Sequence, residues 1–418
     1  MNRTIPLILA VALFMENMDS TVIATSLPAI AVDLQTSPVA LKLALTAYLV
    51  SLAVFIPISG WMADHFGAKA VFRAAIAVFI VGSIACAVSN SLPAFVISRF
   101  LQGIGGAMMT PVGRLVLVRA TPKSELVAAM SWLTVPALLG PLVGPPVGGF
   151  ITTYFSWHWI FLINVPIGLI GIWLATRFLP ETEAAPTPPL DFIGFVLSGL
   201  AASGIVFGLS VVSLPALPPI AGFLTVAVGL VSAVLYLLHA RRAKNPLLAL
   251  ELFRNQVFRA SVLGGGLFRI GIGAVPFLLP LMFQIGFGLT PFQSGMITFV
   301  AAIGAIGMKF VTALIFRVAG FRRVLIFGSL IAAASIAING LLTPETPNLL
   351  ILAILLAGGF IRSRSSPAST RLPMPRFLPP TPAGQRRSPQ CSSNCRSRSA
   401  WRWPAASWKC RRHSMAGR

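Results

Sequence analysis

Five charged residues lie inside long apolar stretches of this sequence, where charge is unfavourable unless it is paired or hydrated. They are Glu16, Asp19, Arg99, Arg269 and Lys309. Charges that persist in such surroundings mark pathways for ions, protons or substrates. Lys309 lies near the end of its stretch, so we expect its long side chain to reach the interface.

Glu16 and Asp19 are the pair whose spacing predicts chemistry. They are three residues apart, so on a helix they share one face. Two carboxylates this close in a low dielectric do not both ionise at low cost, and we expect one of them to bind and release protons. The alternative is an ion pair between Asp19 and Arg99 that only holds two helices together.

Glycine and proline are concentrated between Leu139 and Gly149. The run contains Gly140, Pro141, Gly144, Pro145, Pro146, Gly148 and Gly149. Small residues allow helices to approach closely, and prolines remove backbone donors and kink a helix. We expect a helix that bends around a gate. The glycines Gly103, Gly105 and Gly106 do not indicate nucleotide binding, because no strand–turn–helix surrounds them.

The elements that carry these residues are predicted to be membrane helices. A mean hydropathy of +0.85 and a charged fraction of 10% are typical of a chain dissolved in lipid. A span needs roughly 20 apolar residues. The sequence predicts an all-α polytopic protein with twelve spans, at 5–30, 41–63, 71–90, 93–117, 126–152, 159–179, 191–212, 217–239, 260–286, 292–317, 322–342 and 347–361.

The loops between these spans predict the orientation. Cations collect in cytoplasmic loops, and with the N-terminus inside, 14 of them fall in cytoplasmic loops against Lys42 alone outside. The predicted organisation is a six-helix N-terminal bundle (1–180), two additional spans (191–239), a cytoplasmic linker (240–259), a partial C-terminal bundle of four spans (260–361) and a tail (362–418).

The tail differs from the rest in composition. Residues 361–418 hold 13 Lys and Arg and no acid, out of a net charge of +22 for the whole chain. A genuine Arg/Ser segment of this kind would stay disordered and could bind RNA or anionic lipid. We expect instead an out-of-frame segment, which stays in the cytoplasm, binds no nucleic acid and leaves the chain with impaired transport.

Four motifs resemble those of the drug:proton antiporters of the major facilitator superfamily. They follow one another over 130 residues, as Met18–Pro28, Gly60–Lys69, Arg99–Gly106 and Gly140–Gly149. The additional spans resemble the fourteen-helix branch (EmrB/QacA-like). The stretches Trp157–Pro166 and Leu238–Arg242 are similar to those of its MdtD-type transporters. The resemblance to that branch implies two further spans after residue 361, where we expect a truncated or frameshifted chain instead.

The resemblance implies a major facilitator fold with alternating access around a site near the midplane. It implies proton coupling by Asp19 and Arg99, beside the additional acid Glu16. A possible substrate cavity is expected at Gln102 and Arg269. An inner gate is expected at Asp64, Gly60, Gly67 and Lys69. The family usually has Arg where His65 and Ala68 stand, so we expect fewer charges in the network of this gate.

The expected function is proton-coupled, multidrug-type export of small molecules across a bacterial cytoplasmic membrane, by a multi-pass monomer. Its partners would be the substrate, protons and membrane lipid. An exporter of an organic acid or a metal chelate is the alternative, which Arg99 and Arg269 would favour. An enzyme is not expected, because no HExxH, GxSxG or metal-spaced pair of Asp lies within a span. We expect no cofactor and no metal site.

Overall fold

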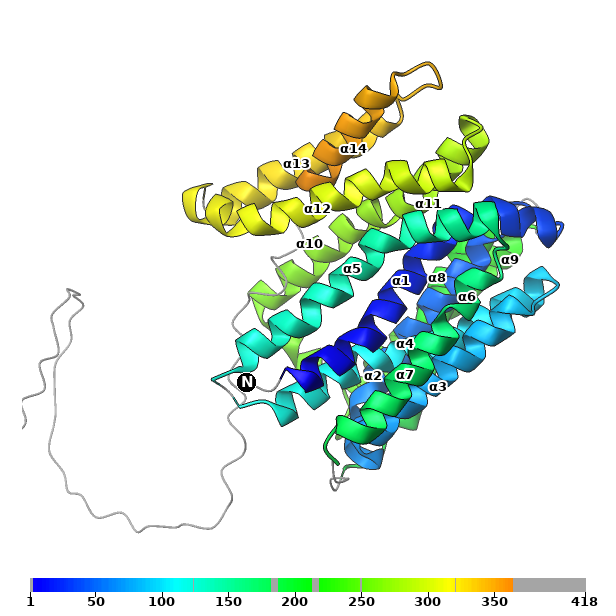
Figure 1. Ribbon diagram of the computed structural model, residues 1–418. Helices are drawn as coiled ribbons and strands as arrows, with labels where there is room; N and C mark the ends of the chain where they lie inside the picture. The colour runs from blue at the N-terminus through cyan, green and yellow to red at the C-terminus, as the bar shows by residue number, and fades with distance from the viewer. Residues whose placement is uncertain are drawn as a thin grey trace, which may run out of the picture. The chain divides into compact units, whose positions relative to one another are not determined.

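The computed structural model describes residues 3–122, 124–181, 187–212, 218–248, 250–319 and 321–363, and all regular elements there are helices (Figure 1). In chain order they are α1 (Thr4–Asp33), α2 (Lys42–Phe66), α3 (Ala68–Ala87), α4 (Leu92–Ala120), α5 (Leu126–Tyr154), α6 (Trp159–Leu162), α7 (Asn164–Phe178), α8 (Phe192–Val212), α9 (Pro219–Ala240), the short η1 (Leu250–Arg254), α10 (Gln256–Gly273), α11 (Val275–Leu281), the π-helical η2 (Met282–Gly286), α12 (Pro291–Ala319), α13 (Phe321–Asn339) and α14 (Asn348–Ser363).

The predicted fold class is confirmed. Each of the twelve predicted spans coincides with one helix or with consecutive helices. In the described part of the chain, ten helical segments are long and apolar enough to cross a membrane, and the apolar helices Phe327–Asn339 and Asn348–Ile361 are shorter. The expected tail begins at 362, and all but its first two residues lie outside the described residues.

Helices α1 to α7 enclose two apolar clusters. In one, Leu9 of α1 packs with Phe72 and Phe79 of α3 and with Met109 of α4, and all four are buried. In the other, the rings of Phe95, Trp157 and Phe161 meet edge to face around the opposite half of α1. Burial of these side chains supplies the packing that holds polar groups between the clusters.

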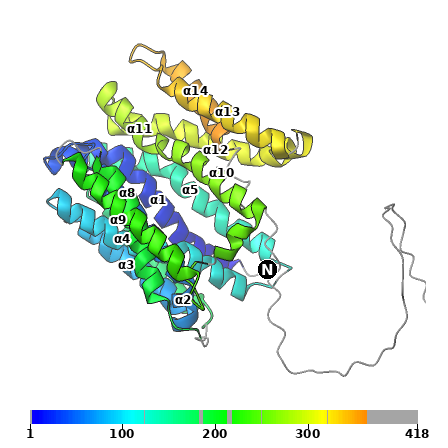
Figure 2. The ribbon, with the colours of Figure 1, turned by 180° about the vertical axis from the view of Figure 1, so that it is seen from behind.

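The additional helices α8 and α9 pair with each other, and α8 packs on α2 (Figure 2). The Thr46 and Ser210 hydroxyls are 3.0 Å apart across this contact. The rings of Phe55 and Phe195 meet edge to face with centroids 5.8 Å apart. The hairpin therefore covers an outer face of α2.

Asp191 connects the start of α8 to the end of α9 and to the linker that follows. Its carboxylate accepts hydrogen bonds from the Gly194 N–H, the His239 ring (2.7 Å) and the Leu247 N–H (3.3 Å). Desolvation opposes the charge, but these hydrogen bonds outweigh it and lower the pKa of Asp191. The Leu248 N–H is held similarly by the Tyr236 hydroxyl, at 2.9 Å. The start of the linker is thus tied to the ends of α8 and α9.

Helix α5 lies between α1 on one side and α12 on the other (Figures 1 and 2). Its Gly140, Gly144 and Gly148 are spaced four residues apart and face α1. A Cβ added to any of these glycines would lie within 3 Å of an atom of α1. The neighbouring Gly149 and Pro145 face α12 instead, against Pro291 and Gly295. Pro141 lies within the helix, half-buried, as do the other prolines of the run.

The close approach of α5 and α12 depends on glycine from both helices. A Cβ on Gly149 would lie 2.4 Å from the Pro291 carbonyl oxygen, and one on Gly295 would lie 2.3 Å from that of Pro145. The Phe292 N–H donates to the Thr153 hydroxyl at 3.0 Å in the same contact. The backbone of α12 therefore rests directly on that of α5.

The C-terminal helices form a smaller cluster. Leu279 and Phe283 pack against Ile351 and Leu355 of α14. A hydrogen bond connects this cluster to α1, where the Gln284 amide donates to the Thr25 carbonyl oxygen at 2.9 Å. The C-terminal helices thus contact the N-terminal bundle through α1 and α5.

Substitution of Gly149 by alanine tests the contact between α5 and α12. The added methyl group would overlap backbone, which cannot move aside as a side chain can. We expect Gly149→Ala to lose about 1–3 kcal/mol of stability and to lower the melting temperature of the purified protein, followed by circular dichroism.

Gly60→Ala is the matched control for this change. It places the same methyl group at an exposed position of α2, where no atom lies within 4 Å of the added carbon. Because alanine is the better helix former, we expect a melting temperature that is unchanged or slightly raised. Equal losses in both variants would contradict the packing assigned to Gly149.

Substitution of Asp191 tests the closure of the α8–α9 hairpin. We expect Asp191→Ala to speed hydrogen exchange at the Leu247 amide at neutral pH, whereas Tyr236→Phe should speed exchange at the Leu248 amide alone. The folded-state pKa of Asp191 is depressed. Its contribution is therefore present above the unfolded value of about 3.9 and is lost as the pH falls through the folded value. Protection of Leu247 that persists in Asp191→Ala would contradict this role.

Candidate functional site: a buried carboxylate–guanidinium network

Asp19 and Arg99 form an ion pair in the interior of the N-terminal helices. Arg99 Nη1 lies 2.7 Å from Asp19 Oδ2, and the two side chains are 0% and 1% exposed. The guanidinium also lies over the Tyr48 ring, 4.5 Å from its centroid, and 5.8 Å from that of Phe161. Such stacking favours a desolvated cation. The ion pair considered from the sequence is therefore present in the structure.

Three further polar side chains complete the network around the carboxylate. Asp19 Oδ1 accepts hydrogen bonds from Gln102 Nε2 at 2.9 Å and from Asn164 Nδ2 at 2.8 Å. The Ser83 hydroxyl lies 2.8 Å from Gln102 Nε2 and 3.3 Å from Asn164 Nδ2. Arg99 Nη1 also donates to Gln102 Oε1. Three donors therefore solvate the ionised carboxylate in place of water.

The network forms because neighbouring helices approach α4 without intervening side chains. A Cβ on Gly82 of α3 would lie 2.5 Å from the Gln102 Cα, so glycine there lets Ser83 reach the Gln102 amide. On the other side, Gly103 lies against Ser51 and the Tyr48 carbonyl of α2. Gly103 and its motif thus serve helix packing.

Some polar atoms of the network have no hydrogen-bond partner. They are Arg99 Nε and Nη2, Asn164 Oδ1 and the Tyr48 hydroxyl, all buried. An unpaired buried polar atom is unfavourable. The network is therefore complete around the Asp19 carboxylate and incomplete around the cation that balances it.

Glu16 does not share the Asp19 network. Its carboxylate is half-buried and accepts a hydrogen bond from the Thr110 hydroxyl of α4 at 2.8 Å. Glu16 and Asp19 lie on one helix, as the spacing predicts, but each carboxylate has its own partner: Arg99 balances Asp19, and Thr110 donates to Glu16.

The four residues expected at a gate are separated into different contacts. Asp64 of α2 pairs with Arg119 of α4, and both side chains are 39% exposed. Lys69 of α3 pairs with Glu181, beyond the end of α7, at 2.8 Å. The ion pair with Lys69 lowers the pKa of Glu181, which is exposed. The family motif thus links four helix ends through two ion pairs.

Gly67 and Gly60 differ in what they contribute. Gly67 has a φ of +85° between α2 and α3, a backbone conformation that L side chains rarely adopt. Gly60 lies in α2 with open space around it. Beside them, the exposed His65 ring stacks on Trp61 with centroids 4.7 Å apart.

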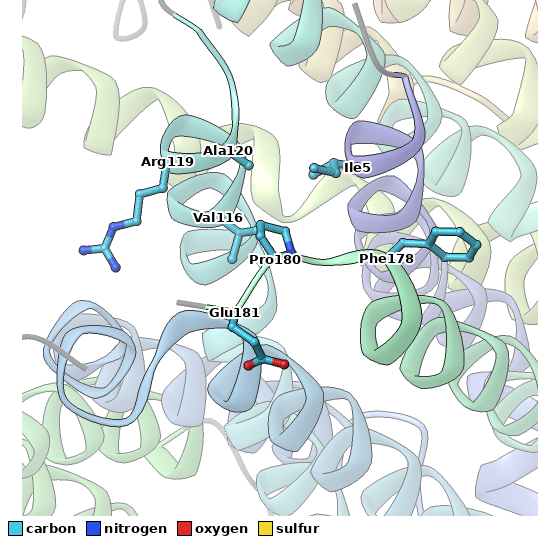
Figure 3. A pocket seen from close by; sticks show the side chains of 7 residues that line it. All are labelled: Ile5, Val116, Arg119, Ala120, Phe178, Pro180 and Glu181. Carbon is cyan, nitrogen blue, oxygen red and sulfur yellow. The ribbon is translucent and has the colours of Figure 1, made fainter. Parts of the chain in front are cut away.

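A hollow of about 430 Å³ lies beside these ion pairs (Figure 3). It is bounded by the start of α1, the end of α4 and the segment after α7, and its lining is mostly apolar. The lining residues are Ile5, Val116, Arg119, Ala120, Phe178, Pro180 and Glu181. The Arg119 side chain extends away from its centre (Figure 3).

The substrate cavity expected at Gln102 and Arg269 is not formed in this structure. Gln102 is completely buried within the Asp19 network. Arg269 is exposed on α10, which packs on η1, α11 and α13. A cavity needs free surface at both residues, and Gln102 has none.

Six residues of these contacts were not identified from the sequence. They are Tyr48, Ser83, Thr110, Arg119, Asn164 and Glu181. Asn164 belongs to the Trp157–Pro166 stretch that resembles the family, so the motif was visible but the partner of its amide was not. Ser83 and Thr110 carry no sequence signal, because a hydroxyl in an apolar helix usually bonds its own backbone.

Comparisons with known proteins agree with this architecture. A sequence profile described as Major Facilitator Superfamily matches residues 9–384. Among solved structures, a D-xylose–proton symporter aligns with a TM-score of 0.60 at 16% identity, over 87% of this chain and 80% of that one. A peptide transporter, POT, solved with sulfate, aligns with a TM-score of 0.62 at 15% identity, over 85% of this chain and 80% of that one. These likenesses show the fold.

Sequence relatives are much more similar. A protein of Pectobacterium atrosepticum strain SCRI 1043 that bears the name multidrug resistance protein MdtD is 42% identical over 334 residues, which are 80% of this chain and 72% of the relative. An Escherichia coli protein of the same name, from strain UMN026, is 40% identical over 319 residues, 76% of this chain and 68% of the relative. With a profile match over most of its length and these identities, the chain belongs to the Major Facilitator Superfamily as a multi-pass membrane transporter.

Proposed function

We propose that this protein exports small molecules of the multidrug class across a bacterial cytoplasmic membrane, in exchange for protons. The observation that carries the proposal is the buried Asp19 carboxylate, balanced by Arg99 inside apolar helices. A charge pair in this position is rarely a stabilising element, because desolvation offsets the attraction between the charges. Ionisable residues in membrane spans accordingly mark transport pathways.

The relatives named as multidrug resistance proteins support the substrate class. The acidity of the site agrees with it. Glu16 is half-buried on α1, so its carboxylate is a second acid on the same helix as Asp19. We therefore assign cationic, partly apolar molecules as the substrates, with Glu16 as their counter-charge.

Proton binding at Asp19 would act through Arg99. When Asp19 is neutral, the guanidinium loses its counter-charge while it remains buried, and an uncompensated buried charge is strongly destabilising. The protonated protein would thus favour an arrangement of α1 and α4 in which Arg99 regains solvent or another acceptor. Its two unpartnered nitrogens, Nε and Nη2, are available to donate to that acceptor.

The helix contacts offer a route from this site to the C-terminal helices. Helix α1 packs along α5, whose other side carries α12. A shift of α1 would therefore act on the α5–α12 contact, where the two bundles of an alternating-access transporter must move against each other. Movement of packed helices past one another is a common form of such change.

The distribution of cations supports an orientation with the N-terminus in the cytoplasm. The Asp64–Arg119 and Lys69–Glu181 ion pairs would then lie at the cytoplasmic ends of their helices. We assign them to an inner gate that keeps α2, α3, α4 and the end of α7 together. We also propose that the transporter works as a monomer.

Replacement of Asp19 tests proton coupling. The purified chain in weakly buffered detergent should release protons when tetraphenylphosphonium, a lipophilic cation, is added. We expect Asp19→Asn to abolish this release, which a pH-indicator dye measures, because the amide has no proton to exchange. Glu16→Gln should weaken cation binding but keep the release per bound cation. Undiminished release from Asp19→Asn would refute the assignment of Asp19.

Replacement of Asp64 tests the gate. In a background without native cysteines, Val116→Cys places a thiol in the hollow, where Val116 is 1% exposed. A partly exposed pair contributes up to about 1 kcal/mol, so we expect Asp64→Ala to raise maleimide labelling of this thiol roughly fivefold. Glu181→Ala, which removes a more exposed partner, should raise labelling less. Labelling that Asp64→Ala leaves unchanged would exclude Asp64 from the gate.

A further inference from the structure

We propose that Asn164 is the positioning residue for proton uptake at Asp19: its side-chain amide holds the ionised carboxylate and sets the pH at which Asp19 binds a proton. This inference rests on the proposed function of Asp19. The other side chains that donate to the Asp19 carboxylate, Arg99 and Gln102, both come from α4, so Asn164 adds α7 to its direct contacts.

The contact between the two side chains is direct. Asn164 Nδ2 lies 2.8 Å from Asp19 Oδ1, and Asn164 is fully buried. A hydrogen bond to the ionised carboxylate stabilises that form over the protonated form, which accepts fewer donors. Bonds to charged groups are stronger than bonds between neutral groups. The Asn164 amide is thus placed to stabilise the charge of the Asp19 carboxylate.

Local structure fixes the direction of the Asn164 amide. Asn164 is the first residue of α7, directly after the interruption that separates α6 from α7. Pro166 has no N–H, so the Leu162 carbonyl loses its helical partner at this point. The second contact of Asn164 Nδ2, to the Ser83 hydroxyl at 3.3 Å, holds the amide from the side of α3.

Asn164 differs from the other two donors on Asp19 in its helix of origin. Arg99 and Gln102 both belong to α4 and would move together with it. Asn164 is anchored on α7, which packs on α1 and α3. It can therefore hold Asp19 Oδ1 independently of α4, when the Arg99 pair is broken by protonation.

The remaining ionisable groups near Asp19 are few in the described part of the chain. They come from α1 (Glu16), α2 (Tyr48), α3 (Cys86) and α4 (Arg99). Helix α11 has no charged residue, and α5 and α7 have none near this depth, with Tyr154 and Arg177 close to their ends. The cations of α12, Lys309 and Arg317, lie in its second half. Asn164 thus contributes a neutral dipole that does not itself titrate.

The experiment measures protonation of Asp19 directly in the purified full chain. Infrared difference spectra recorded between acidic and alkaline pH contain a protonated-carboxyl band, and the part that Asp19→Asn removes belongs to Asp19. We expect Asn164→Leu to move the midpoint of this band upward by about one pH unit, a tenfold higher proton affinity, which is the effect of one lost hydrogen bond to a charged group.

Two variants separate this role from packing. Asn339→Leu makes the same change at a buried asparagine of α13 whose amide oxygen is likewise unpartnered, and it should leave the midpoint in place. Asn164→Gln keeps an amide, and its midpoint should lie closer to the native value than that of Asn164→Leu. If Asn164→Leu does not fold, Asn164→Ala, which cannot clash, carries the same expectation.

The outcomes distinguish this inference from the function on which it rests. Absence of any Asp19-dependent band over the whole pH range would refute proton coupling by Asp19. A band that titrates in the native chain but has the same midpoint in Asn164→Leu, or in Asn164→Ala, would overturn the role of Asn164 alone. An equal shift in Asn339→Leu would also overturn it, because the effect would then be non-specific.

Discussion

The central constraint on this structure is a pair of opposite charges buried among apolar helices. Asp19 and Arg99 are both almost completely removed from solvent, where either charge alone would be strongly unfavourable. Each is therefore tolerated only while the other is present and while polar side chains replace the water that both have lost. Gln102, Asn164 and Ser83 do this for the carboxylate, and the Tyr48 ring does it in part for the guanidinium.

This requirement explains why small residues surround the pair. A hydrogen-bond network among four helices needs backbones close enough for short side chains to meet, and glycine at position 82 brings α3 against α4 at Gln102. The same device recurs along α5, whose glycines admit α1 on one side and α12 on the other. In lipid, where apolar burial between helices gives little driving force, such close packing is also the main source of helix association.

The sequence was sufficient for the helices and for the identity of the charged residues, and it offered Asp19 and Arg99 as a pair, but it did not identify their other partners. Hydropathy predicts the spans because each helix satisfies its own backbone. Spacing within α1 correctly places Glu16 and Asp19 on one helix, yet the partner of each, Thr110 or Arg99, lies far away in the chain. Arg119, the partner of Asp64, is likewise distant in the chain. Arg269 shows the converse, since it is exposed on α10 and shares no cavity with Gln102, which is completely buried.

Within the proposed mechanism, the position of α5 decides how proton binding at Asp19 affects the distant contact between α5 and α12. A proton on Asp19 changes the energy of Arg99, and both residues are held by helices that touch α5 or one of its neighbours. At Gly149 and Gly295 backbone meets backbone, so at these two positions no side chain lies between α5 and α12 to absorb a displacement. Closely packed interfaces of this kind tend to change between discrete arrangements rather than deform gradually. The glycine and proline run of α5 therefore has two consequences, since the small residues that allow tight packing also make the contact respond as a unit to changes at α1.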